Sequence, residues 1–131
     1  MTVGLSAANT ANKLLNTIGR TAAPAAFTAG VLYVALHTAD PGASGTTAAS
    51  AVTTRVSPTF SAASAGSMAM TSMASTWSMT ATETISHISL WDASTAGNFM
   101  WSVALTTSKS VINGDTLSLS SLTLAFTPIA A

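Results

Sequence analysis

The sequence predicts a mainly β protein with one N-terminal helix, folded as an antiparallel β-sandwich or a jelly-roll-like structure. Apolar residues recur at helical spacing only once, near the N-terminus. The rest of the chain consists of short apolar runs separated by turn signals. Because 131 residues suit one modest core, we expect a single domain over residues 1–131, with the helix at 6–18 and the sandwich at 31–127.

The predicted helix begins after Ser6, whose hydroxyl can accept a hydrogen bond from a free amide of the first turn. Gly19 can adopt the left-handed conformation that ends many helices, and Pro24 disfavours a restart of the helix. The narrow apolar face of this helix consists of Leu14, Leu15 and Ile18, together with Ala8 and Ala11.

The predicted strands lie at 31–37, 51–60, 67–81 (one or two strands), 85–91, 99–106 and 116–127. Pro58 restricts the second of these to a sheet edge or a bulge. Turn residues at 92–98 predict that the strands on either side form a hairpin. Further turns are expected at 40–42 and 113–115. In the last strand the apolar positions change parity at Ser120-Ser121, which predicts a β-bulge.

Charged residues are unusually rare in this chain. They make up 6% of it, whereas a typical soluble domain contains about 25%. The formal net charge is zero and hydrophobic residues account for 48%. Because zero charge favours association and interfaces are depleted in Lys, Glu and Asp, we expect partner subunits to cover much of the surface. The alternative is a Ser/Thr-rich monomer that its hydroxyl groups keep soluble.

The composition also argues against several other classes of protein. Neutral charge disfavours a nucleic-acid partner. No apolar run is long enough for a membrane-spanning helix, and the first residues lack the features of a signal peptide, so no membrane partner is expected. Without Cys there is no disulfide framework and no thiolate metal site.

Few residues could carry chemistry. The spacing of the acidic and His residues matches no metal-binding or catalytic pattern. These residues are His37, His87, Asp40, Asp92, Asp115 and Glu83. We therefore predict no catalytic residue, no metal site and no cofactor. A small hydrolase or a glycan-binding domain is kept as a remote alternative.

A segment rich in Met and Trp follows the second predicted strand. Its side chains can fill the core, which is the simpler interpretation, or form a contact surface, because Met adapts to irregular partners and both residue types are enriched at interfaces. Together with the apolar helix face, they make up the candidate interface: Leu14, Leu15, Ile18, Met68, Met70, Met73, Trp77 and Met79.

Several segments together resemble one protein family. They are NKLLN at 12–16, LYVALHTADP at 32–41, ISLWDA at 88–93, GNFMW at 97–101, ALTTSKSV at 104–111 and NGD at 113–115. Their order and spacing resemble small virion structural proteins of tailed phages, usually labelled tail fibre proteins and sometimes minor tail or head-decoration proteins. The resemblance covers nearly the whole chain outside about residues 43–80 and implies no catalytic residues.

From this resemblance and the shortage of charge we place capsid decoration first. Such a protein forms a homo-oligomer, often a trimer, that binds the major capsid protein and stabilises the assembled shell. The alternative is a tail-fibre or minor tail protein involved in host attachment, which would bind tail proteins and carry recognition loops at 40–50 and 92–98. Both hypotheses place the protein in the virion after synthesis in the host cytoplasm.

Overall fold

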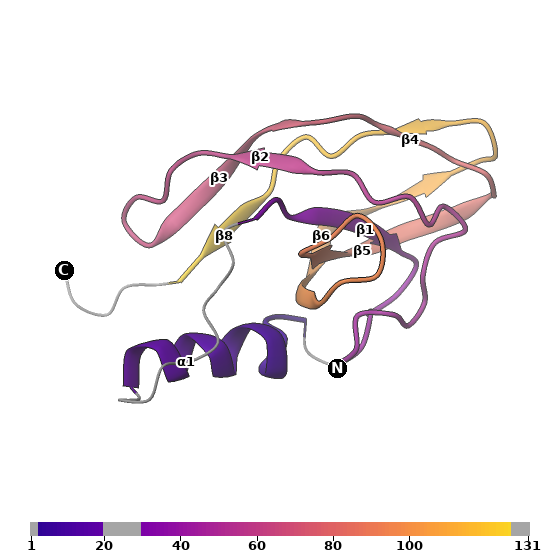
Figure 1. The fold of residues 1–131 in the computed structure, drawn as a ribbon. Helices are drawn as coiled ribbons and strands as arrows, with labels where there is room; N and C mark the ends of the chain where they lie inside the picture. The colour runs from indigo at the N-terminus through magenta and orange to yellow at the C-terminus, as the bar shows by residue number, and fades with distance from the viewer. Residues whose placement is uncertain (1–2, 20–29, 127–131) are drawn as a thin grey trace.

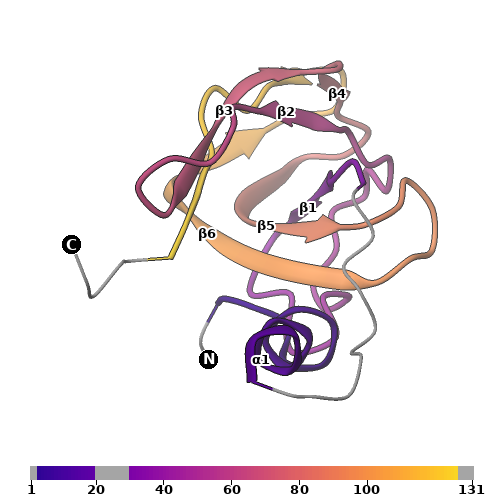
Figure 2. The same cartoon turned by 60° about the vertical axis from the view of Figure 1, so that its left-hand side comes forward.

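The computed structural model describes residues 3–19 and 30–126 of the chain. Its strands form two layers, and the N-terminal helix lies on the outer side of one of them (Figures 1 and 2). The strands are β1 (Tyr33–His37), β2 (Pro58–Phe60), β3 (Ser67–Met73), β4 (Trp77–Ser78), β5 (Glu83–Trp91), β6 (Phe99–Val111), β7 (Thr116–Leu117) and β8 (Thr123–Ala125). The predicted class, mainly β with antiparallel sheets and one N-terminal helix, is confirmed.

One layer is the sheet β1-β5-β6, and the other contains the sheet β2-β3-β8 and the two-stranded ribbon β4-β7. All of these pairs are antiparallel. β5 is the central strand of the first sheet and is buried along most of its length because each of its faces is covered. Ile88 and Leu90 point into the core between the layers, whereas Ser89 and Trp91 alternate with them on the outer face.

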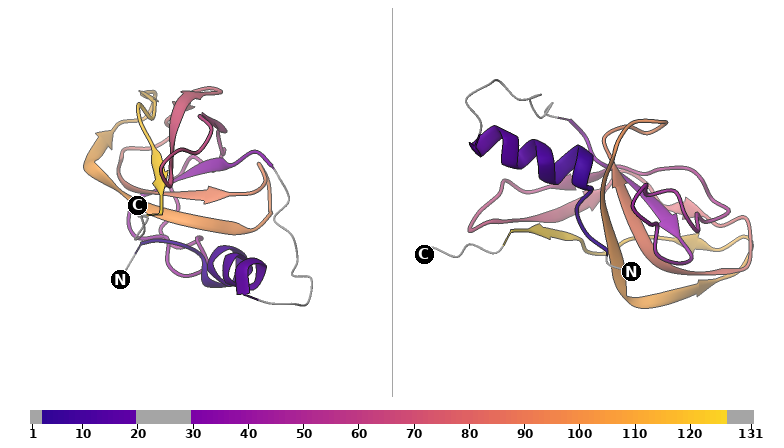
Figure 3. Two further views of the ribbon diagram at one scale, coloured as in Figure 1. Left: turned by 90° about the vertical axis from the view of Figure 1, so that its left-hand side faces the viewer. Right: turned by 90° about the horizontal axis from the view of Figure 1, so that it is seen from below.

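The N-terminal helix begins as predicted after Ser6, whose Oγ accepts a hydrogen bond from the Asn9 amide at 3.3 Å. Its first part is a π-helical turn, η1 (Ala7–Ala11), and α1 (Asn12–Gly19) continues it (Figure 3). The expected left-handed Gly19 is wrong, because Gly19 is the last residue of α1 and does not have a positive φ. Glycine in a helix costs only about 1 kcal/mol, which neighbouring turns can offset. Pro24 lies outside the described residues.

The hairpin of β5 and β6 around residues 92–98 is confirmed, but β6 is longer than predicted. It continues past Thr106 to Val111. The register with β5 shifts within this strand, since His87 pairs with Ala104 whereas Ile85 pairs with Lys109. Residues 105–108 of β6 lie between these pairs and form an irregularity in the pairing of the two strands. Beyond them, polar residues pair again along an exposed part of β6.

The structure corrects one further strand prediction and confirms two. The predicted strand 51–60 is shorter, because Val56 pairs with Val34 of β1 and only β2 joins the second layer. β2 is an edge strand, as Pro58 predicted, since proline has no amide hydrogen to donate. The region 67–81 contains two strands, β3 and β4, which is within the prediction.

The prediction of a β-bulge at Ser120-Ser121 is wrong. The final segment is instead interrupted between β7, which pairs with β4, and β8, which pairs with β3. The parity change has the predicted consequence, since Leu117 and Leu119 before the break and Leu122 and Leu124 after it all pack on the core. No helix in the described ranges has the length and apolar character needed to cross a lipid bilayer.

Candidate binding cleft

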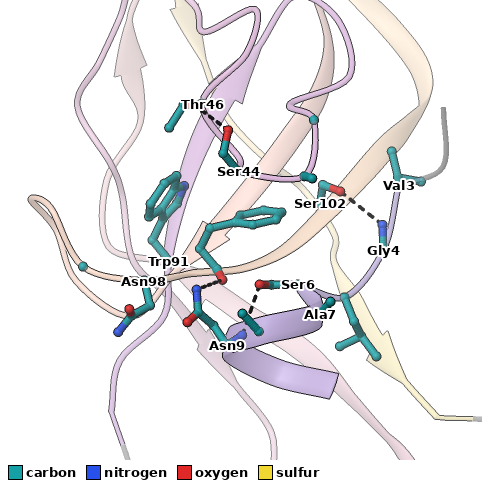
Figure 4. A pocket seen from close by; sticks show the side chains of 16 residues that line it. Val3, Gly4, Ser6, Ala7, Asn9, Ser44, Thr46, Trp91, Asn98 and Ser102 are labelled. Carbon is teal, nitrogen blue, oxygen red and sulfur yellow. Dashed lines mark hydrogen bonds between the residues drawn. The ribbon is translucent and has the colours of Figure 1, made fainter. Parts of the chain in front are cut away.

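A cleft of about 720 Å3 opens on the outer side of the β1-β5-β6 sheet (Figure 4). Three parts of the chain that are distant in sequence form its walls. They are residues 3–9, residues 97–99 and residues 42–46, and Trp91 and Ser102 from β5 and β6 also line the cleft. Cavities that bind small ligands commonly have volumes of about 300–1,000 Å3. Its size is therefore sufficient for a small ligand, and its chemistry depends on how each wall is built.

The N-terminal wall is hydrogen-bonded to the start of β6. The Ser6 amide donates to the Met100 carbonyl at 2.8 Å, and the Ser102 amide donates to the Gly4 carbonyl at 2.8 Å. Farther along, Asn9 Nδ2 donates to the Phe99 carbonyl at 3.1 Å. Thr10, which is buried, donates through Oγ1 to the Met100 carbonyl at 2.8 Å. These bonds hold residues 4–10 against the sheet as an additional, irregular strand and turn.

The second wall is the loop at 92–98, which two charged residues hold in place. Asp92 accepts hydrogen bonds from the Asn98 amide at 2.6 Å and from Asn98 Nδ2 at 2.8 Å. Partial burial raises the pKa of the Asp92 carboxyl, but these hydrogen bonds outweigh burial, so its pKa lies below the usual value. Arg55 donates to the carbonyls of Ala93 and Ala96 at 2.9 and 2.6 Å. Its guanidinium also lies 3.8 Å from the centre of the Trp91 ring.

The third wall is the loop that follows β1. Asp40 Oδ1 accepts a hydrogen bond from the Gly42 amide at 2.8 Å, which forms the turn predicted at 40–42. Gly45 has a φ of +74°, and a Cβ atom built on it would lie 2.3 Å from Phe99 Cδ2. The loop backbone therefore approaches the Phe99 ring as closely as only glycine permits.

His37 connects this loop to the sheet beneath it. His37 is 2% exposed, and its Nδ1 lies 2.9 Å from the Thr47 carbonyl oxygen while Nε2 lies 2.7 Å from Ser89 Oγ. Because a carbonyl only accepts, Nδ1 carries the proton, and Nε2 accepts from the Ser89 hydroxyl. Ser89 Oγ in turn accepts from Trp91 Nε1 at 2.8 Å. Protonation of Nε2 would take this acceptor from the Ser89 hydroxyl, so the chain of hydrogen bonds favours the neutral ring.

The His37 network predicts a loss of stability in mild acid. Burial is the main cause that lowers the pKa of His37 below 6.5, with smaller contributions from His87 across the strand pair and from Arg55. Since the folded state disfavours the protonated ring, the contribution of His37 to stability is constant above about pH 6.5 and falls as the pH drops from there toward the folded pKa. We expect urea midpoints measured between about pH 7 and pH 5 to fall for the wild type and much less for His37→Gln. An equal fall in His37→Gln would contradict this assignment.

The residues that the structure describes do not assemble a metal centre. Within 3–19 and 30–126, no three His, Asp or Glu side chains gather closely enough to hold a metal ion. Ser89 beside His37 is 0% exposed, so this Ser–His pair cannot meet a substrate. His87 lies opposite His37 in the register of β1 and β5.

The structure divides the candidate interface residues between different environments. Trp77 and Met79 are 2% exposed and belong to the core, so they offer a partner no surface, in agreement with the simpler interpretation of this segment. Met68, Met70 and Met73 are half-buried on β3 and pack on the same core. On α1, Leu14 is half-buried, whereas Leu15 and Ile18 are 67% and 76% exposed. Contact between a partner and the half-buried and exposed members of this set stays a prediction.

Sequence reasoning did not identify the cleft itself. It treated the loops at 40–50 and 92–98 as recognition loops of one hypothesis, and residues of both line this cleft. It missed the contribution of residues 3–9, because Ser6 and Asn9 carried only a helix-capping signal. The pairing of Leu5 with Trp101, which brings this segment to β6, has no local sequence signature.

Comparison with known families places the chain among virion structural proteins of tailed phages, because one family model matches residues 5–127. That family is described as Podophage GP4 fiber I protein gp80, and the chain belongs to it. No curated protein matches the sequence. The suspected resemblance is thus confirmed. The family match favours the fibre alternative over capsid decoration, which it does not support.

Proposed function

We propose that this protein is a fibre module of a tailed-phage particle that takes part in attachment to the host cell. The family match over residues 5–127 carries this proposal. The cleft adds support, because its walls come from an N-terminal segment and two loops that the sheet holds in defined positions. Surface loops on a rigid scaffold are common binding elements.

An adsorption experiment tests the proposal. Monovalent antibody fragments raised against the folded protein are mixed with purified phage, and the rate at which phage adsorb to host cells is measured. We expect the fragments to slow adsorption in proportion to their occupancy of the particle. Fragments against the major capsid protein are the matched control and should leave the rate unchanged. Normal adsorption by phage saturated with the first fragments would overturn the proposed role.

Self-association is the second part of the proposal. The apolar side chains of Leu15 and Ile18 are exposed on α1, and the neutral chain gives two copies no net charge repulsion. We expect a homo-oligomer, such as a trimer, in which a second copy covers this face. Its partners in the particle would then be other tail proteins.

Changing the α1 face should alter the oligomeric state. Light scattering after size-exclusion chromatography should give an oligomeric mass for the wild type and a monomeric mass for the double variant Leu15→Asp/Ile18→Asp, because an interface cannot bury an unpaired carboxylate without a large penalty. The control Asn12→Asp/Thr17→Asp, on the same helix, adds the same two negative charges at exposed residues and should keep the oligomer. A monomeric wild type would contradict self-association.

A further inference from the structure

We propose that the cleft between residues 3–9, 42–46 and 97–99 binds an uncharged saccharide. This inference rests on the proposed role in host attachment and names the chemical class of ligand for that role. Three properties of the cleft support it: the absence of charge among its lining residues, the hydrogen-bonding groups that its walls leave available, and its preformed shape.

The lining residues make a charged ligand unfavourable. Among the described residues that line the cleft, none is Asp, Glu, Lys, Arg or His. The nearest charged side chains of the second wall already have partners, since Asp92 bonds to Asn98 and Arg55 bonds to the carbonyls of Ala93 and Ala96. A phosphate or carboxylate placed here would lose its hydration without gaining a cation. The geometry therefore favours a neutral ligand.

The polar groups of the cleft suit a ligand rich in hydroxyl groups. Ser44 and Thr46 are exposed and hydrogen-bonded to each other at 2.8 Å, so one of the two hydroxyl hydrogens is free to donate. Ser6 also lines the cleft, but it is only 5% exposed and its Oγ accepts from the Asn9 amide, so it offers a ligand little surface. Asn9 Nδ2 donates to the Phe99 carbonyl (Figure 4). This bond fixes the orientation of the Asn9 side chain and leaves Asn9 Oδ1 to accept from a ligand. Sugar hydroxyl groups both donate and accept, so they can meet both kinds of group.

Aromatic residues contribute an apolar base to this cleft. The rings of Trp91 and Phe99 lie with their centres 5.7 Å apart, and both residues line the cleft. They are only 7% and 6% exposed, so the polar groups carry most of the recognition and the rings contact the ligand with a small area. A sugar ring, which combines C–H groups with hydroxyl groups, fits such a mixed surface.

Contacts within the protein hold the walls of the cleft in place. Gly45 packs against Phe99, residues 4–6 pair with β6, and Asp92 fixes Asn98. A site formed in advance loses little conformational freedom on binding, which matters for a weakly bound saccharide.

Saturation-transfer difference NMR tests the assignment on the full chain. The probes are a panel of neutral oligosaccharides built from glucose, galactose, rhamnose or N-acetylglucosamine, and glucuronic-acid disaccharides as the charged comparison. We expect transfer to one or more neutral probes and none to the charged disaccharides. In the double variant Ser44→Ala/Thr46→Val, which removes two exposed hydroxyl groups, affinity for the same probe should fall about 3- to 10-fold.

Two further variants keep the test decisive. Ala43→Trp, at an exposed lining residue, adds bulk to the cleft and should abolish transfer. The matched control, Thr107→Val/Ser118→Ala, makes the same kind of change in a separate groove of about 450 Å3 and should keep wild-type affinity. Absence of transfer from every neutral probe, or equal affinity of the cleft and control variants, would overturn the saccharide assignment.

The outcomes separate this inference from the proposed function. If antibody fragments block adsorption but no neutral saccharide binds, the attachment role stands and the ligand assignment fails. If a neutral saccharide binds in the cleft but the fragments leave adsorption unchanged, the site exists and the attachment role fails.

Discussion

Trp77→Ala is expected to destabilise the protein by about 3–5 kcal/mol, because it removes a large buried side chain and leaves a cavity. Trp77 is 2% exposed and packs in the core between the two layers. Its Nε1 donates to the Thr54 carbonyl at 2.9 Å, and that acceptor also loses its partner. A small domain has a total stability of about 5–15 kcal/mol, so this one change consumes a large share of it.

Urea unfolding followed by circular dichroism measures this effect. Trp101→Ala is the matched control, since Trp101 is half-buried and its truncation should cost clearly less. The comparison also separates the two sequence interpretations of Trp77. If Trp77→Ala kept the wild-type urea midpoint and changed only the oligomeric state, Trp77 would contact a partner and the described core would be wrong.

Gly45→Ala should have the second large effect, about 2–5 kcal/mol of destabilisation. The substitution forces an alanine to a φ of +74° and places its Cβ against the Phe99 ring, where the nearest atom would be 2.3 Å away. Loop 42–46 or the ring must move, and both line the cleft. We therefore expect a lower urea midpoint together with weaker binding of any ligand in the cleft.

Gly114→Ala is the control that isolates the steric part. Gly114 also has a positive φ, +94°, but a Cβ atom there would meet nothing within 4 Å. Its substitution should cost only the backbone strain, about 1–2 kcal/mol. Phe99→Ala should reduce the additional cost of Gly45→Ala in a double-mutant cycle. Equal costs for the two glycine substitutions would show that Phe99 does not approach Gly45 in solution.

The elements that the sequence predicted correctly depend on local chemistry. Ser6 caps the helix, the turn at 40–42 uses Asp40 and glycine, and Pro58 lies on an edge strand, because each depends on the backbone properties of one or two residues. The parity change in the last segment also correctly predicted that Leu122 and Leu124 lie in the core. It did so because side chains alternate between the two faces along a strand.

Apart from the local prediction of a left-handed Gly19, the corrections concern interactions between distant parts of the chain. Val56 pairs with Val34 and shortens the predicted strand, and β7 and β8 separate because they have different partners. The cleft also depends on such pairings, which bring Gly4 and Ser6 to β6 and Gly45 to Phe99. A single sequence does not show which segments pair with one another. The walls of the cleft could therefore be predicted only as separate loops.

The location of the protein in the particle is the most direct test of its assignment as a fibre module. Gold-labelled antibody fragments against the folded protein are bound to intact phage and viewed by electron cryomicroscopy. We expect label at the tail, on its fibres, and an unlabelled head. Label distributed over the capsid surface would contradict it and would return the protein to the role of a capsid decoration protein.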